Sequence, residues 1–392
     1  MSLRVGMVAG EPSGDRLGAG LLQALAADGP VEAIGVGGAE LAQVGLQSIA
    51  PMTELTMHGF VEPLRRLPRL WRLLRNIEER MLAAKVDVFV GVDFNVFNLL
   101  LERRLKRCGI ATVHYVSPSV YAWRKGRVKR IAKSADLLLA LFPFEPALYA
   151  GQPLRVAFVG HPMADEIEPQ DRSGARPTTA RNALDLPPGE PVICLMPGSR
   201  SSEIRYMLRP FLAAARQFLQ YKPNARFLLP CATSALRAEV EAIALQPSYA
   251  DLPLQILDDE ARLALAASDA ALVKSGTSTL EAMLLGVPMV VGYRLGSLSY
   301  QLIKRLIRTP FIALPNILAG RALVPELLQD AMQPTLLAAE LRTQLREESR
   351  TQLLAAFADL HADLRLDASV KGAREIRGLV AGTLAADLQK EA

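Results

Sequence analysis

The sequence predicts an α/β protein of two domains, each with parallel strands that alternate with helices. Its 392 residues are enough for two domains that each bury a core, and half of them are hydrophobic while 22% are charged, as in globular proteins. In both halves of the chain, short apolar runs are followed by helical patterns, which is typical of parallel sheets covered on both faces. Residues 165–181 are rich in Pro, Ser, Thr and Gly and are predicted to link the halves.

The composition narrows the classes of function. A net charge of +5 suits anionic small molecules, anionic lipid or nucleic acid alike. Cys108, Cys194 and Cys231 lie far apart, and the four histidines show no metal-ligand spacing, so we expect neither a disulfide framework nor a metal site. We also expect a cytoplasmic protein, because there is no signal-peptide core and no run of about 18 apolar residues to span a membrane.

Six apolar runs in the N-terminal half are predicted to be strands: residues 3–9, 31–36, 86–92, 111–116, 137–142 and 155–159. The first run leads through a Gly-rich turn at 10–19 into a helix that ends near Ala27. The glycine spacing of this turn fits neither a dinucleotide fingerprint nor a P-loop. We expect the turn to line a binding cleft and to contact neutral hydroxyls; the alternative is that Asp15 only caps the helix.

Asp93 comes directly after the buried run at 86–92, and Asn95 and Asn98 follow it. Ligands of open α/β sheets bind beyond the carboxyl ends of the strands. A carboxylate in that place can act as a general base when it lies near a hydroxyl. The competing interpretation is that Asp93 caps a helix at 94–104.

Four runs in the C-terminal half are predicted to be strands, at 192–196, 226–229, 254–257 and 270–273. Small residues follow two of them and open a helix, at 198–199 and 275–277. The N–H groups at a helix start have no partner inside the helix and bind phosphate well, and Arg200 can pair with a phosphate through two hydrogen bonds. Glu281 is placed to bind ribose hydroxyls, or else it forms a capping box with Ser278 that needs no ligand.

The stretch at 64–75 predicts a basic amphipathic helix. Its apolar residues recur at helical spacing and are Leu64, Leu67, Leu70, Trp71 and Leu74, while the residues between them include Arg65, Arg66, Arg69, Arg72 and Arg75. Such a helix is suited to an anionic membrane surface. The alternative is an ordinary surface helix with leucine in the core and arginine in water. Pro68 is expected to kink or offset the helix.

Basic and aromatic residues gather at 117–130, where Tyr121 and Trp123 are interleaved with arginine and lysine. They could stack on bases, as in nucleic-acid binders, or hold a phosphate and a sugar face. Because no nucleic-acid-binding motif accompanies them, we do not expect a nucleic-acid partner. Asn316 and Arg321 are polar groups in an otherwise apolar segment marked by Gly and Pro.

Six short motifs together carry a resemblance to a known family. In chain order they are GEPSGDxxGA from Gly10, HYVSPSVYAWR from His114, FPFE from Phe142, MPGSR from Met196, SGT from Ser275 with Glu281, and LPNILAGR from Leu314. From the first strand to about Gln333 the sequence therefore resembles the lipid A disaccharide synthases. The resemblance implies two Rossmann-like domains that face each other across a cleft, the GT-B arrangement. It places the domains at 1–165 and 181–340, with helices at 341–392 that return to the first.

The resemblance implies an inverting glycosyltransferase that needs no metal or other cofactor. Such enzymes move 2,3-diacylglucosamine from UDP-2,3-diacylglucosamine to the 6-hydroxyl of 2,3-diacylglucosamine 1-phosphate (lipid X), giving a β-1,6 disaccharide and UDP. Because both substrates are acylated, the expected location is the inner face of the inner membrane of a Gram-negative bacterium, as a monomer or homodimer. The alternatives are another UDP-sugar enzyme of the same fold, an epimerase or a hydrolase, and a nonenzymatic peripheral-membrane module.

The same resemblance implies roles for individual residues. Those expected to hold the UDP donor are Gly198, Ser199, Arg200, Ser275, Gly276, Thr277, Glu281, Asn316 and Arg321. Those expected to meet the acceptor and its phosphate are Ser13, Tyr121, Trp123 and Arg124. Those expected to face the membrane are Leu64, Arg65, Leu67, Arg69, Leu70 and Trp71. Asp93 becomes the favoured general base, with Glu11 and Asp15 as the alternatives.

The sequence departs from the family pattern at the expected base. The family usually has Asp-x-Pro-Asp-Phe-Asn, whereas this chain has Asp93-Phe-Asn-Val-Phe-Asn, so Val96 stands in place of the second aspartate. If that second aspartate were the base, this chain would have none. Residues 57–59 read Met-His-Gly instead of Val-Met-Gly, and Tyr121 replaces a common Trp; both changes could alter the preference for acyl chains.

Overall fold

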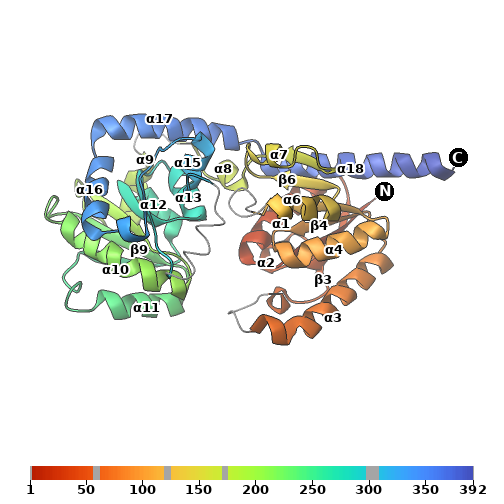
Figure 1. The fold of residues 1–392 in the computed structure, drawn as a ribbon, viewed down its shortest axis with the longest axis horizontal. Helices are drawn as coiled ribbons and strands as arrows, with labels where there is room; N and C mark the ends of the chain where they lie inside the picture. Colours follow the sequence, from red (N-terminus) through yellow and green to blue (C-terminus); the bar gives the residue numbers. More distant parts are fainter. Residues whose placement is uncertain (1, 56–61, 119–124, 170–174, 297–308, 392) are drawn as a thin grey trace. The chain divides into compact units, whose positions relative to one another are not determined.

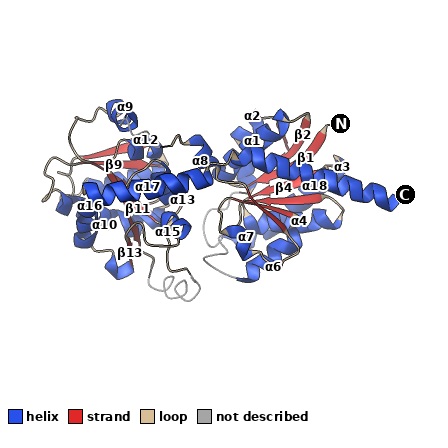
Figure 2. Cartoon of the chain, turned by 90° about the horizontal axis from the view of Figure 1, so that it is seen from above, coloured by secondary structure: helices blue, strands red, loops and turns tan. Residues whose placement is uncertain are grey.

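The computed structural model describes residues 2–55, 62–118, 125–169, 175–296 and 309–391. The chain divides into two compact units, unit 1 of Met1–Asp165 with Leu364–Ala392 and unit 2 of Glu166–Asp363 (Figure 1). In each unit, parallel strands lie between helices, as Figure 2 shows with strands in red and helices in blue. This arrangement confirms the predicted class of two Rossmann-like α/β domains.

The described part of unit 1 has a sheet of seven strands in the order β3-β2-β1-β4-β5-β6-β7. They are β1 (Leu3–Ala9), β2 (Val31–Val36), β3 (Leu46–Ser48), β4 (Val88–Val92), β5 (Ala111–Tyr115), β6 (Leu137–Ala140) and β7 (Arg155–Phe158). The accompanying helices are α1 (Pro12–Ala27), α2 (Ala39–Gln43), α3 (Glu62–Ala83), α4 (Asn95–Arg107), α6 (Lys125–Ser134), α7 (Glu145–Leu148), α8 (Pro162–Glu166) and α18 (Ala368–Glu391). The strand order reverses between β1 and β4, and such a reversal leaves a ligand-binding crevice at the carboxyl ends of the two strands.

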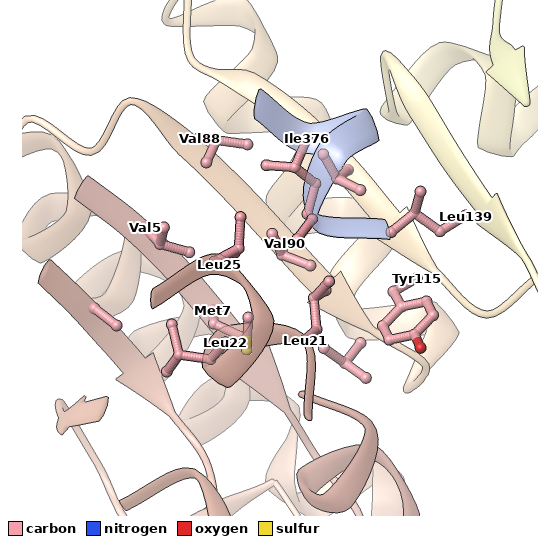
Figure 3. Packing of buried hydrophobic residues seen from close by; sticks show 14 of the residues in the cluster. Val5, Met7, Leu21, Leu22, Leu25, Val88, Val90, Tyr115, Leu139 and Ile376 are labelled. Carbon is pink, nitrogen blue, oxygen red and sulfur yellow. The ribbon is translucent and has the colours of Figure 1, made fainter. Parts of the chain in front are cut away.

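Successive residues of the central strands of unit 1 pack on opposite faces of the sheet. Val5 and Val90 join a cluster under α1 and α18, in which Ile376 of α18 takes part (Figure 3). Val8 and Phe89 belong to a second cluster, formed with residues of α3 and α4. Because both faces are buried, these strands read as continuous apolar runs in the sequence.

The described part of unit 2 has six strands in the order β10-β9-β8-β11-β12-β13. They are β8 (Val192–Met196), β9 (Arg226–Cys231), β10 (Leu254–Asp258), β11 (Ala270–Lys274), β12 (Met289–Tyr293) and β13 (Glu326–Leu328). The accompanying helices are α9 (Ala175–Ala183), α10 (Ser201–Phe218), α11 (Ser234–Ala244), α12 (Ala261–Ala266), α13 (Thr277–Leu284), α15 (Leu314–Ala319), α16 (Pro334–Gln344) and α17 (Glu347–Leu364). Here the strand order reverses between β8 and β11.

The segment predicted to be a linker is partly ordered. Its described residues from 175 onward form α9, which belongs to unit 2. Arg181 of α9 pairs with Asp269 at 2.7 Å and donates to the carbonyl of Ala267 at 3.0 Å. The linker prediction was therefore wrong for this part, because composition does not reveal a partner some 90 residues away.

The C-terminal chain returns to unit 1 later than the predicted boundary at 341. Residues 341–363 belong to unit 2, where Leu341 packs in the same cluster as Phe211 of α10. The return begins at Leu364, and α18 carries it. The edge strands β3 and β13 were not predicted, because three residues are too few to show a periodic pattern.

Candidate active site

The two reversals of strand order bring the predicted site residues to neighbouring strand ends. In unit 1, Ala9 pairs with Val92 at the ends of β1 and β4, so Gly10 and Asp93 leave the sheet side by side. In unit 2, residues 198–200 follow β8 and residues 275–277 follow β11, and these two strands also pair. Each unit therefore presents its candidate residues where open parallel sheets bind ligands.

Asp93 sits in a turn with an uncommon backbone. Both Asp93 and Phe94 have a left-handed φ, of 47° and 44°, a conformation that costs on the order of 1–3 kcal/mol for a residue other than glycine. The turn is held by its neighbours, because the Asp93 N–H donates to the carbonyl of Tyr115 at 2.8 Å and Asn98 Nδ2 donates to the carbonyl of Asp93 at 2.9 Å. Strained turns of this kind cluster at functional sites.

The carboxylate of Asp93 does not cap α4. The helix begins at Asn95, Phe94 is its N-cap, and no side chain of the described residues caps it. Asp93 Oδ1 instead accepts a hydrogen bond from Asn95 Nδ2 at 2.9 Å. Burial raises the pKa of Asp93, and the charge of His114 and the hydrogen bonds from Phe94 and Asn95 oppose this only in part. A half-buried carboxylate with a raised pKa is a stronger base than an exposed one.

The two alternative bases in the first turn have different surroundings. Glu11 is exposed at the start of α1, as is Ser13. Asp15 is buried and caps α2 instead of its own helix, since its carboxylate accepts the N–H groups of Gly38 at 2.6 Å and Glu40 at 3.0 Å. With both oxygens engaged by backbone donors, Asp15 serves to hold the start of α2, and capping of α1 by Asp15 was wrong.

The turn after β8 is shaped by one glycine and one carboxylate. Gly198 has a φ of +129°, and a Cβ there would lie 2.4 Å from Glu203 Oε2. That oxygen accepts the N–H of Ser199 at 2.9 Å, while Oε1 lies 2.9 Å from Lys274 Nζ. Burial works against the charged form of Glu203, yet the hydrogen bond and charge of Lys274 lower the pKa of this carboxyl below its usual value. Arg200 projects from this turn with 74% of its side chain exposed.

The turn after β11 opens α13. Gly276 is the N-cap with a φ of +149°, and among the described residues no side chain caps this helix. Ser278 is already the second residue of the helix, and Glu281 pairs with Arg262 at 3.2 Å. The capping box was therefore wrong, and the N–H groups at the start of α13 keep the character of an anion site.

The two predicted donor residues near α15 differ in exposure. Asn316 is fully buried: its Nδ2 donates to the carbonyl of Val324 and to Glu326, and its Oδ1 accepts from the N–H groups of Leu323 and Val324. It thus fixes the loop between α15 and β13. Arg321, on the same loop, is exposed. Ser275 Oγ donates to the carbonyl of Ile312 and ties the start of α13 to the chain before α15.

The predicted membrane helix exists as α3, which runs through Pro68 and continues to Ala83. Its later part packs in the core of unit 1 through Leu73, Leu74 and Ile77. On the outer side Trp71 is 45% exposed, with the Arg104 guanidinium 5.9 Å from its ring centre. Among the described residues, no helix is apolar and long enough to cross a membrane.

Some of the residues predicted to face the membrane or the acceptor lie outside the described residues. Arg69 is exposed and lies 3.6 Å from Glu54, and Leu70 is half-buried. The side chains of Leu64, Arg65 and Leu67 lie outside the described residues, as do the predicted acceptor residues Tyr121, Trp123 and Arg124. Over the described residues, no group of three His, Cys, Asp or Glu side chains is placed to hold a metal ion.

Sequence reasoning missed several polar residues that contact the predicted site residues or lie behind them. They are Glu203, Lys274 and Arg262 in unit 2, and Glu102 with His114 in unit 1. A signal existed for Lys274, because a charged residue ends an otherwise apolar strand at the small-residue turn. No local pattern marks the partners of the others, which come from separate elements.

Comparison with known proteins decides which family the chain belongs to. The sequence profile of the family described as Lipid-A-disaccharide synthetase matches residues 5–371. The lipid-A-disaccharide synthase of Pseudomonas aeruginosa (strain UCBPP-PA14) is 48% identical over 380 residues, which cover 96% of this chain and 98% of that protein. The chain belongs to the lipid-A-disaccharide synthetase family.

Membership of this family makes the protein a glycosyltransferase of lipid A disaccharide synthesis, as the motifs predict. Solved structures agree on the fold. The glycotransferase of kitacinnamycin matches with a TM-score of 0.63 at 14% identity, covering 96% of this chain and 99% of that one. Anabaena Alr3699/HepE, solved in complex with UDP and glucose, matches with a TM-score of 0.58 at 14% identity, covering 97% and 100%. The GT-B fold class is thereby confirmed.

Proposed function

We propose that this protein moves 2,3-diacylglucosamine from UDP-2,3-diacylglucosamine to the 6-hydroxyl of lipid X in one inverting step, with Asp93 as the general base. The observation that carries the proposal is the set of chemical groups that lie at the two strand-order reversals. Unit 2 offers helix starts and an exposed Arg200 to an anion, and unit 1 offers a half-buried carboxylate. The family supports the reaction, and a protein of the same fold that binds UDP supports UDP as the leaving group.

The diphosphate of the donor would bind at the starts of α10 and α13. Helix dipoles favour an anion at these starts. The N–H groups at the start of α13 would donate to the diphosphate, whereas the N–H of Ser199 already donates to Glu203 at 2.9 Å. Arg200 and Lys274 supply positive charge, with Lys274 held by Glu203 at 2.9 Å. Glu281 would bind the ribose, and Asn316 would act by fixing the loop that carries Arg321.

Asp93 would remove the proton of the acceptor hydroxyl as that oxygen attacks the anomeric carbon. The carbon–oxygen bond to UDP breaks in the same step, and the leaving diphosphate takes the negative charge. Because arginine, lysine and backbone N–H groups stabilise that charge, we propose that the reaction proceeds without a metal. No cofactor is needed either, since neither electrons nor a carrier group enter the step.

The test of this proposal is the release of UDP from UDP-diacylglucosamine by the purified protein, with and without lipid X. We expect UDP and the disaccharide to appear in equal amounts and only when lipid X is present, and EDTA should leave the rate unchanged. Release of UDP at the same rate without lipid X would show a hydrolase. Formation of a UDP-sugar of changed stereochemistry, without any disaccharide, would show an epimerase.

We further propose that α3 places the protein on the inner face of the inner membrane. Leu70→Ser with Trp71→Ser should release the protein from vesicles of anionic phospholipid, because these side chains supply apolar area at the outer side of α3. Added salt should weaken binding of the unchanged protein through its arginines. Sedimentation with vesicles measures both effects.

The matched control is Leu245→Ser, an apolar residue of unit 2 that is 74% exposed. It should leave vesicle binding unchanged. If the unchanged protein stays in solution with anionic vesicles at low salt, α3 is an ordinary surface helix.

A further inference from the structure

A chain of polar side chains leads from the core of unit 1 to Asp93. His114 Nδ1 lies 2.6 Å from Glu102 Oε1, and both side chains are fully buried. His114 Nε2 lies 3.1 Å from Asn95 Oδ1, and Asn95 Nδ2 lies 2.9 Å from Asp93 Oδ1. The role proposed for Asp93 does not by itself explain why a buried acid and histidine stand behind it.

The packing around this hydrogen-bond network is unusual. Glu102 and Asn95 are seven residues apart on α4 and therefore share one face of the helix, while His114 on β5 pairs with Gly91 on β4. A Cβ at Gly91 would lie 2.2 Å from Glu102 Oε1, so only glycine admits the carboxylate. Glu102 Oε2 has no hydrogen-bond partner within the described residues. A buried acid with one oxygen unpaired destabilises a fold, which indicates a use for it.

The donors and acceptors along the chain fix the position of one proton. Asn95 Nδ2 donates to Asp93, so Asn95 Oδ1 is an acceptor, and the hydrogen bond at 3.1 Å requires a proton on His114 Nε2. The proton between His114 Nδ1 and Glu102 can reside on either partner. Burial raises the pKa of Glu102, and the charge and hydrogen bond of His114 lower it in part. In both forms Nε2 keeps its proton and points it at Asn95.

We propose that Glu102 and His114 are positioning residues for Asp93 and act on it through Asn95. The pair holds Asn95 in the one amide orientation that donates to Asp93 Oδ1, and this leaves the second carboxylate oxygen to receive the substrate proton. When the shared proton resides on His114, its positive charge also favours the ionised form of Asp93. The inference rests on the proposed role of Asp93 as general base.

A further charged group beside this hydrogen-bond network, Lys106, has partners of its own. Lys106 lies one turn after Glu102 on α4, donates to the carbonyl of Ala135 at 2.8 Å and pairs with Asp136 at 2.8 Å. The pH response of Asp93 is therefore assigned to Asn95 and to the Glu102–His114 pair.

The decisive variant is Asn95→Ala, which removes the link at the start of α4 without opening the core. We expect kcat near neutral pH to fall about tenfold, as for loss of a hydrogen bond to a charged group, with KM for both substrates within about twofold. The acid limb of the kcat–pH profile should move to higher pH, because the hydrogen bond from Asn95 lowers the pKa of Asp93. The control is Arg103→Ala, an exposed residue on the same helix, which should change neither quantity.

His114→Asn, alone and combined with Asn95→Ala, tests whether His114 acts through Asn95. We expect the loss in the double variant to equal the larger single loss; if His114→Asn does not fold, Asn95→Ala alone decides. A kcat of Asn95→Ala that is unchanged, or reduced equally at every pH, would overturn the positioning role. Failure of the general-base role of Asp93 can be told apart from failure of the positioning role. It would appear as retained turnover in Asp93→Asn, whatever Asn95→Ala shows.

Discussion

Asp93→Asn should reduce kcat by about 10²–10⁴-fold, the usual effect of losing a general base. The amide keeps the size of the carboxylate and can still accept the hydrogen bond from Asn95 Nδ2, so the turn should persist and UDP affinity should be unchanged. What is lost is the capacity to take the proton of the 6-hydroxyl. Turnover with both substrates and UDP titration by calorimetry give the two quantities.

Turnover should also depend on pH through the ionisation of Asp93. Only the ionised form of Asp93 can accept a proton, and burial raises the pKa of this carboxyl. Turnover of the unchanged protein should therefore fall as the pH drops through that raised pKa, and the residual turnover of Asp93→Asn should lack this limb.

The control for Asp93→Asn is Asp87→Asn, the same change just before the opposite end of β4. Asp87 pairs with Arg4 at 2.6 Å and stands away from the carboxyl edge of the sheet. Its variant should lose some stability and keep turnover within about twofold. If Asp93→Asn keeps more than about a tenth of the normal turnover, less than the usual general-base effect, Asp93 is not the base, and exposed Glu11 becomes the carboxylate to test.

Arg200→Ala should raise KM for the UDP donor, or lower turnover, by about tenfold or more, since a charge-assisted pair with phosphate is worth about 1.5–3 kcal/mol. The side chain is 74% exposed, and the carboxylate of Glu203 lies 3.6 Å from its guanidinium. The fold should therefore tolerate its removal, and the melting temperature should stay close to normal.

Arg209→Ala is the matched control, because Arg209 is exposed two turns along α10 and donates to Gln246. It should leave KM unchanged. If Arg200→Ala and the unchanged protein have equal KM values and equal turnover, Arg200 is excluded from the donor site, and Lys274 is the cation to test at this edge of unit 2.

The sequence by itself determined the class of fold, because buried parallel strands are continuous apolar runs and their helices follow at once. It also placed Asp93, residues 198–200 and residues 275–277 correctly at strand ends, since each follows directly on an apolar run. The motifs in their order predicted the family that the comparisons confirm. These features are local, and adjacent residues suffice to show them.

Only the tertiary structure decided how side chains from separate elements are used. Asp15 has the position of a cap for its own helix, yet its carboxylate caps α2. The pairing of β1 with β2 brings the start of α2 close to Asp15. Glu281 fits a capping box, yet it pairs with Arg262 from α12. In the sequence, Glu102 and His114 look like an ordinary helix residue and an ordinary strand residue. The pairing of β4 with β5 brings them together behind Asp93. Hydrogen bonds form between atoms that the fold brings close, and sequence distance carries no record of that closeness.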